Sequence, residues 1–254
     1  MRVAVLLCLT LCSGPAVAAD PPVGVQALLA AYPEHLAGFE DGHVIWADGT
    51  RMPWGEVSTL AGEARFDHSS LADQLAQPYP VGTTFAPPCE DQEPGRARSA
   101  DFFARMYGAT RAEVRSNLDR VPWLPSRGTG RRAVLVTRVN GVSVALGQIV
   151  SELDGLAPGA RAVAAKVQGG FAWRPVRGTS RPSAHSFGIA IDIGGAWADY
   201  WRWTRPLPGG RRPWRNRLPR SIVEIFERHG FIWGGKWHHF DTMHFEYRPE
   251  LLPR

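Results

Sequence analysis

The sequence predicts an α+β protein, and three observations support this fold class. Helical and strand-like patterns do not alternate in the βαβ rhythm of a parallel sheet, and the predicted strands are short. The 254 residues include 44% hydrophobic and 21% charged residues, which is typical of an ordinary globular chain. This length corresponds to one large domain or two small ones. No apolar run reaches the roughly 18 residues of a membrane-spanning helix, so we expect no membrane span.

The first residues have the three parts of a secretory leader. Arg2 supplies a positive n-region, residues 3–11 form an apolar h-region, and Ala16-Val17-Ala18 is an A-x-A cleavage signal. A glycine and a proline interrupt the apolar run where a leader would end, which disfavours the alternative of a buried N-terminal helix. We therefore predict a signal peptide at residues 1–18 and an exported protein, either periplasmic or secreted.

Removal of this leader changes the cysteine count. Cys8 and Cys12 lie in the leader, so Cys89 alone stays in the mature protein. One cysteine cannot form an internal disulfide, and a packed core or a metal must therefore stabilise the exported chain. A metal site made of several thiolates is excluded for the same reason.

The chain carries a net charge of +5, and only two of its 29 Lys and Arg residues are lysines, Lys166 and Lys236. A basic chain is typical of nucleic-acid binding. Arginine-rich composition is also a property of some genomes, however, and overall charge alone is weak evidence of function. Because the arginines are spread along the chain and the leader predicts export, we expect no nucleic-acid partner. An anionic cell envelope is the better match for this charge.

Residues 19–130 contain no motif that we can place, and we predict an N-terminal extension with helices and a hairpin. The hairpin is expected at 43–52, where the Asp48-Gly49 pair favours a tight turn. Residues 77–95 are rich in proline and are predicted to form an irregular connection. Apolar side chains at helical spacing predict helices at 25–32, 100–107 and 111–118.

The second half of the chain has clearer patterns. Amphipathic spacing predicts helices at 144–156 and 219–229, and Gly230 stands at the expected C-cap of the latter. Asn140-Gly141 marks a turn. Short apolar or alternating runs predict strands at 133–139, 161–168, 170–173, 187–193, 232–233 and 243–247.

Two histidines and a carboxylate are a common ligand set for catalytic zinc, which keeps a fourth position open for water. His185, Asp192 and His244 supply such a set if the strands that carry them are neighbours. Gly188 lets the chain bend between His185 and Asp192. In a straight strand, these two residues would point to opposite faces. Spacing alone does not separate this set from histidines that are ordinary core or surface residues.

Two further residue types complete a hydrolytic site of this kind. Asp241 precedes His244 by three residues and is placed to take a proton from a water molecule that the metal acidifies. Arg174 or Arg177 supplies a fixed positive charge for the oxyanion or for a substrate carboxylate.

Together these motifs resemble the M15 family of zinc D,D- and L,D-peptidases. Residues 183–192 read Ser-x-His-x6-Asp, residues 233–237 read Trp-Gly-Gly-x-Trp, and an Asp-x-x-His motif ends at His244. The resemblance covers residues 131–249 and predicts a peptidase domain at 131–254. The family fold that it implies is a small antiparallel sheet flanked by helices, with zinc at its centre.

The resemblance also implies a role for each motif residue. The three residues that match zinc ligands are His185, Asp192 and His244. Asp241 matches the general base, and Ser183 matches a serine that forms hydrogen bonds near the substrate. Arg174, at the end of Gly-Gly-Phe-Ala-Trp-Arg, is the better match to the arginine that stabilises the transition state, and Arg177 is the weaker one.

Several nearby residues have two interpretations. His238 and His239 either orient the predicted base and touch substrate or lie on the surface of a connecting loop. Glu246 shares a strand face with the second histidine ligand, so it is either its hydrogen-bond partner or a solvated edge charge. Tryptophan is more often a core residue, but Trp201 and Trp203 are the best candidates to line a substrate groove.

The resemblance implies an exported zinc peptidase that hydrolyses peptidoglycan stem peptides. We expect D-alanyl-D-alanine carboxypeptidase activity, because an exported chain without a wall-binding repeat is not built like a lysin. The Trp-Gly-Gly box and the aspartate of Asp-x-x-His favour the alternative of an L-alanyl-D-glutamate endopeptidase. A zinc-containing wall-binding protein without turnover is a further alternative, which the intact base Asp241 disfavours.

Overall fold

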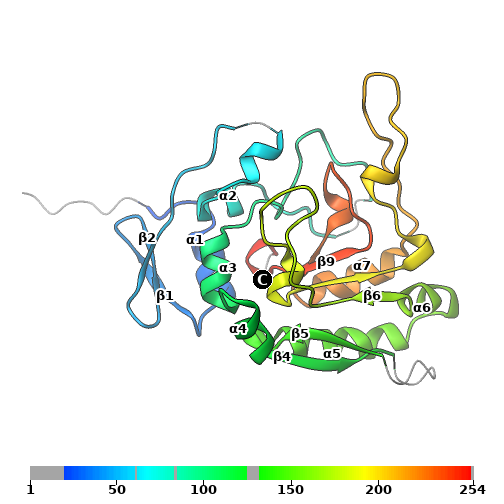
Figure 1. Ribbon diagram of the computed structural model, residues 1–254, viewed down its shortest axis with the longest axis horizontal. Helices are drawn as coiled ribbons and strands as arrows, with labels where there is room; N and C mark the ends of the chain where they lie inside the picture. Colours follow the sequence, from blue (N-terminus) through cyan, green and yellow to red (C-terminus); the bar gives the residue numbers. More distant parts are fainter. Residues whose placement is uncertain (1–19, 61, 83–84, 125–131, 253–254) are drawn as a thin grey trace, which may run out of the picture.

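The computed structural model describes residues 20–60, 62–82, 85–124 and 132–252. The predicted signal peptide, residues 1–18, lies outside this part of the chain. Within the described ranges, no helix is long and apolar enough to cross a membrane. Small antiparallel sheets, short helices and 3-10 turns build the fold (Figure 1), which confirms the predicted α+β class.

The described N-terminal residues form a three-stranded antiparallel meander and four helices. β2 (His43–Trp46) and β3 (Arg51–Pro53) are the predicted hairpin, and β1 (Leu36–Glu40) adds a strand that the sequence patterns did not indicate. The helices are α1 (Val25–Ala31), α2 (Leu71–Leu75), α3 (Ala100–Tyr107) and α4 (Arg111–Ser116). The described residues between 77 and 95 form no helix or strand, as predicted.

Two further antiparallel sheets follow along the chain, and the first of them joins a strand from each side of residue 130. β4 (Leu118–Pro122) pairs with β5 (Ala133–Thr137). The second sheet has the order β6–β7–β9–β8, and its strands are β6 (Val167–Gly169), β7 (Ala190–Ile193), β8 (Phe231–Trp233) and β9 (His244–Tyr247). The accompanying helices are α5 (Val142–Asp154), α6 (Pro158–Ala164) and α7 (Arg220–Arg228). α7 contacts both β8 and α5, so helices flank this sheet.

Three strand predictions need correction. The first half of the predicted strand 161–168 belongs to α6, because Pro158 suits the first helical turn and the alanines that follow favour a helix, and the strand β6 begins only at Val167. The predicted strand 170–173 pairs with no other strand. The predicted strand 187–193 begins only at residue 190, since a 3-10 turn precedes it and ends at Gly188 with a φ of 69°.

One hydrophobic core joins the N-terminal and C-terminal parts. The buried residues of α1, α3 and the meander belong to the same cluster as those of β7, α7 and β9. The ring of Phe103 on α3 lies 5.6 Å from that of Phe187, and the hydroxyl of Tyr32 donates a hydrogen bond to Glu250 at 2.7 Å. The predicted boundary at residue 130 lies outside the described ranges and stays a prediction.

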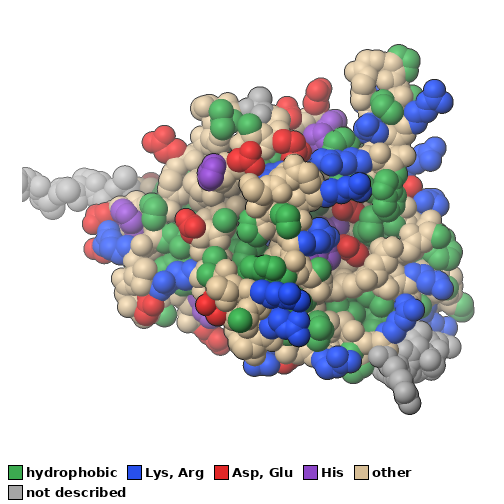
Figure 2. Space-filling model, viewed as in Figure 1, with side chains coloured by type: hydrophobic (Ala, Val, Ile, Leu, Met, Phe, Trp, Pro, Cys, Tyr) green, Lys and Arg blue, Asp and Glu red, His purple; other side chains and the backbone are tan. Residues whose placement is uncertain are grey.

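One loop projects from this body. Residues 203–215 rise away from the rest of the chain beyond the 3-10 turn Trp201–Trp203 (Figure 1). The space-filling view shows basic side chains along this projection (Figure 2). All residues from 205 to 211 are exposed.

Candidate metal centre and catalytic cleft

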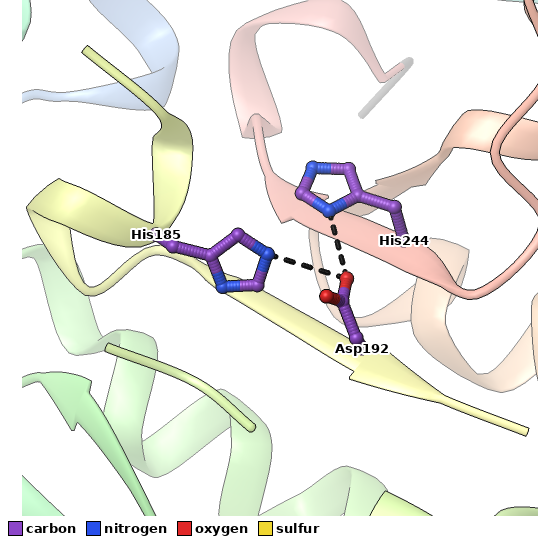
Figure 3. Close-up of side chains that lie close together, drawn as sticks. All are labelled: His185, Asp192 and His244. Carbon is purple, nitrogen blue, oxygen red and sulfur yellow. Dashed lines mark hydrogen bonds and ion pairs between the residues drawn. The ribbon is translucent and has the colours of Figure 1, made fainter. Parts of the chain in front are cut away.

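The antiparallel pairing of β7 and β9 brings the predicted metal ligands together. The register of these strands places Asp192 directly opposite His244. His185 comes from the 3-10 turn Ala184–Phe187, and the left-handed conformation of Gly188 returns the chain into β7. Both imidazole rings point toward the carboxylate of Asp192 (Figure 3). The three residues could hold a metal ion, because one ligand atom from each lies within 4.8 Å of the others.

Hydrogen bonds on the outer side of each imidazole set the orientation of the inner nitrogen. Nδ1 of His185 donates to the carbonyl oxygen of Gly170 at 2.6 Å, so its Nε2 faces Oδ1 of Asp192 with a lone pair, at 3.2 Å. Nε2 of His244 donates to Oε1 of Glu246 at 3.0 Å, and its Nδ1 lies 3.0 Å from the same Asp192 oxygen. Three electron-pair donors therefore converge, which suits a cation.

The carboxylates around His244 set its protonation in the absence of a metal. Burial acts to lower the pKa of His244, but hydrogen bonds to Asp192 and Glu246 outweigh burial and raise this pKa to about 10. Burial acts to raise the pKa of Asp192, and the hydrogen bonds from His185 and His244 hold it well below its usual range. A cation bound between these groups would replace the proton of His244, so metal binding should release protons.

Glu246 has the first of its two predicted interpretations: it is the hydrogen-bond partner of His244 and is buried. Arg98 donates to it at 2.7 Å, and Arg248 lies 3.4 Å away. Burial acts to raise the pKa of Glu246, but the cation of Arg98 and the hydrogen bond from His244 bring it to about 2. The carboxylate that orients His244 is thus held ionised, in part by an arginine from the N-terminal part.

Glu246→Gln should weaken metal binding. The carboxylate of Glu246 makes the imidazole of His244 a more basic and therefore stronger ligand, and the neutral amide of glutamine does not. We expect zinc affinity to fall by about 10- to 100-fold, measured by calorimetric titration of the metal-free protein. Glu224→Gln is the matched control, since Glu224 pairs with Arg220 at the surface of α7. Equal zinc affinities for the wild type and Glu246→Gln would contradict this role.

Asp241 reaches the same cleft from the loop before β9. Its Oδ1 is buried and has no hydrogen-bond partner among the described residues. Burial raises the pKa of Asp241 to about 7, the carboxylate of Asp192 acts in the same direction, and His244 opposes both. A buried carboxylate with one free oxygen and a pKa near neutrality is suited to accept and release a proton.

The two glycines of the Trp-Gly-Gly box are required by the packing around Asp241. A Cβ on Gly234 would lie 2.6 Å from the carbonyl oxygen of Asp241, and one on Gly235 would lie 2.1 Å from the ring of Trp233. The carbonyl of Gly234 also accepts a hydrogen bond from the N–H of Asp241 at 2.9 Å. The box therefore holds the Asp241 loop close to β8.

The two candidate arginines and the candidate serine also line the cleft. Arg174 and Arg177 form no ion pair with a carboxylate in the described part of the chain. Arg174 acts to lower the pKa of Asp241, so its charge reaches the predicted base. The hydroxyl of Ser183 accepts a hydrogen bond from the backbone N–H of His185 at 3.4 Å. Their roles toward a substrate stay predictions.

Sequence reasoning missed two residues, Ser186 and Gly170, that position Arg174 and His185 in the cleft. The hydroxyl of Ser186 accepts a hydrogen bond from the backbone N–H of Arg174 at 2.9 Å and donates to its carbonyl oxygen at 2.7 Å. Gly170 supplies the carbonyl that orients His185, and a Cβ there would lie 2.4 Å from the carbonyl oxygen of Leu135. The glycine pair at 169–170 was a signal in the sequence that could have indicated Gly170. Nothing in the sequence distinguishes Ser186 from other serines.

Aromatic side chains contribute to the lining of the cleft, which has a volume of about 560 Å³. Trp201 and Trp203 line it as candidate groove residues, together with Tyr200 and Trp237. His239 also lines the cleft, with its ring 4.5 Å from that of Trp201 and its Nδ1 against Glu93. The lining does not include His238, whose ring packs against that of His239.

A cleft with two histidines, an aspartate and a second carboxylate that has one buried oxygen without a partner is typical of metal-dependent hydrolases. Residues 177–247 match the model of a peptidase M15 family described as D-alanyl-D-alanine carboxypeptidase. This match confirms the resemblance for that segment, which holds all three candidate ligands and Asp241. No curated protein and no solved structure matches the chain.

Proposed function

We propose that this protein is an exported zinc peptidase that removes the terminal D-alanine from peptidoglycan stem peptides. The observation that carries the proposal is the convergence of His185, Asp192 and His244 beside the buried free oxygen of Asp241. The match of residues 177–247 to a family described as D-alanyl-D-alanine carboxypeptidase supports the reaction class. The leader pattern at residues 1–18 supports export.

Zinc held by His185, Asp192 and His244 would supply a Lewis acid that polarises the scissile carbonyl and makes water more acidic. Asp241 accepts the proton of the attacking water as the oxygen bonds to the carbonyl carbon. It then delivers this proton to the amine nitrogen as the C–N bond breaks. The guanidinium of Arg174 stabilises the negative charge on the carbonyl oxygen.

Two unpaired cations favour a carboxypeptidase. The terminal carboxylate of a stem peptide needs a positive partner in the cleft, and Arg174 and Arg177 have no carboxylate of their own in the described part of the chain. With Arg174 on the oxyanion, Arg177 is left for the terminal carboxylate. A guanidinium pairs with a carboxylate through two parallel hydrogen bonds, which would also orient the last residue.

One observation favours the second candidate, an L-alanyl-D-glutamate endopeptidase. A neighbouring cavity of about 260 Å³ shares Arg96, Arg98 and Arg181 with the cleft. The hollow surface therefore continues beyond the cleft, and a peptide chain that extends past the scissile bond would find space there.

Digestion of defined muropeptides distinguishes these candidates. The mature protein is incubated with pentapeptide muropeptides, with zinc or with a chelator, and the products are identified by mass. We expect loss of one terminal alanine that the chelator abolishes and added zinc restores. Cleavage between L-Ala and D-Glu would instead establish the endopeptidase. No chelator-sensitive product from any muropeptide would leave a non-catalytic wall-binding protein and contradict the proposal.

A further inference from the structure

The positive charge of this chain is concentrated in one segment. Residues 200–220 contain seven arginines and no aspartate or glutamate. Subtracting these seven charges from the net +5 leaves −2 for all other residues together. The expectation that arginines are spread along the chain is therefore wrong for this segment, which includes the projecting loop 203–215 described above.

The tip of the projection is apolar and its sides are basic. The N–H of Leu207 donates to the carbonyl of Arg211 at 2.8 Å and the N–H of Gly210 donates to the carbonyl of Leu207 at 2.9 Å, which closes a tight turn. At the tip, Leu207 stands between two prolines and is 41% exposed; at the base of the projection, Trp203 is 64% exposed. Figure 2 shows hydrophobic side chains at the end of the projection and basic side chains along it.

Polar contacts hold the base of the projecting loop 203–215, which is folded as a hairpin, against the rest of the protein. Arg212 donates to the carbonyl oxygens of Trp201 and Thr204. The indole N–H of Trp214 donates to the carbonyl of Gly235, in the Trp-Gly-Gly box, at 2.9 Å. Arg217 forms an ion pair with Asp199 at 3.0 Å. The hairpin is thus fixed at its base while its tip extends into solvent.

Three arginines on the hairpin have no internal partner for their charge. Arg205, Arg211 and Arg215 are exposed, and among the described residues they form no ion pair. Some surface arginines on this protein do pair with carboxylates, as the pair of Arg228 with Glu152 illustrates. The unpaired charges on both sides of the hairpin are therefore available for an anionic partner.

We propose that residues 203–215 dock on an anionic lipid bilayer. The exposed Leu207 and its flanking prolines at the tip enter the headgroup region, Trp203 at the base of the projection lies at the interface, and the flanking arginines pair with lipid phosphates. A soluble polyanion such as a nucleic acid would pair with the arginines but would not provide an apolar environment for the exposed Leu207. Because Trp203 also lines the cleft, docking would bring the cleft close to the membrane surface. This inference does not depend on the proposed peptidase activity.

Flotation of the mature protein with lipid vesicles tests the proposal. We expect binding to phosphatidylglycerol vesicles at least roughly tenfold tighter than to phosphatidylcholine vesicles, and weaker binding as salt is raised. Arg205→Gln/Arg211→Gln/Arg215→Gln should weaken binding on the order of 100-fold. The control Arg111→Gln/Arg115→Gln/Arg120→Gln removes the same charge from exposed positions on α4 and β4 and should bind like the wild type.

A second variant separates a membrane from other anions. Trp203→Ser/Leu207→Ser keeps every arginine, so it should lose vesicle binding yet keep any binding to single-stranded DNA or polyphosphate. Unchanged vesicle binding by this variant, or equal losses in the two arginine triples, would overturn the proposal. Thermal unfolding of each variant shows whether it is folded, and none of these measurements requires a catalytic assay.

Discussion

Asp241→Asn should abolish most peptidase turnover while the protein still binds zinc. The variant keeps the shape of the side chain but cannot accept a proton, and positioned proton transfer contributes about 10²- to 10⁴-fold to a reaction rate. We expect kcat to fall by about this factor with little change in KM. Zinc affinity should change little, because His185, Asp192 and His244 and the hydrogen bonds that orient them remain.

Asp192→Asn is the contrasting variant for this prediction. Asp192 contacts both imidazoles, so its loss should remove zinc binding and turnover together. Asp101→Asn changes an exposed carboxylate on α3 and should leave both unchanged. Turnover by muropeptide mass analysis and zinc binding by calorimetry are measured on all three proteins. An Asp241→Asn enzyme with near wild-type kcat would show that another group moves the proton.

The three candidate ligands could be predicted because their motifs resemble those of a zinc-peptidase family, although their spacing alone does not distinguish them from ordinary histidines. Asp192 and His244 lie on strands with clear apolar patterns, and the register of β7 and β9 places them opposite each other. The period of two along β9 likewise placed Glu246 on the same face as His244. Residue types that bind metals are few, so a small number of segments had to be considered.

The groups that hold the site in place could not be predicted in the same way. Arg98 contacts Glu246 across 148 residues of sequence, and Trp237 donates its indole N–H to the carbonyl of Pro94 across 143. Neither contact leaves a periodic pattern, because each depends on how distant segments pack. The strand error at 161–168 has a local origin instead, since alternating apolar residues occur on short helices as well as on strands.

The N-terminal part therefore helps to hold the site in place, although it contains no motif that predicted this role. It supplies Arg98 to Glu246, the phenol of Tyr79 to Glu227, and the carbonyl of Gly95 to Arg248. Each of these contacts satisfies a charged group that is buried in the C-terminal part. Glu246 and Glu227, which lie in the segment that matches the M15 family model, are thus stabilised by residues outside that segment.

Arg248→Met should destabilise the protein by about 3–5 kcal/mol, because it leaves buried carboxylates without their counter-ion. Arg248 is fully buried, contacts Glu250 at 2.6 Å, and donates to the carbonyl of Gly95 at 2.7 Å. After the substitution, the donors to Glu250 that remain among the described residues are the neutral groups of Tyr32 and Gln74. Urea unfolding of the metal-free protein measures the change in the free energy of unfolding.

Two further variants show whether this effect arises from a buried charge. Arg228→Met removes an exposed partner of Glu152, and pairs of this kind contribute at most about 1 kcal/mol. Arg248→Met/Glu250→Gln removes the charge that the single variant leaves unpaired, so it should recover part of the lost stability. If Arg248→Met lowered the free energy of unfolding no more than Arg228→Met does, Arg248 would not be the ion that stabilises the contact between the N-terminal and C-terminal parts. If only the double variant were stable, the penalty would lie in the uncompensated carboxylate of Glu250 and not in lost packing.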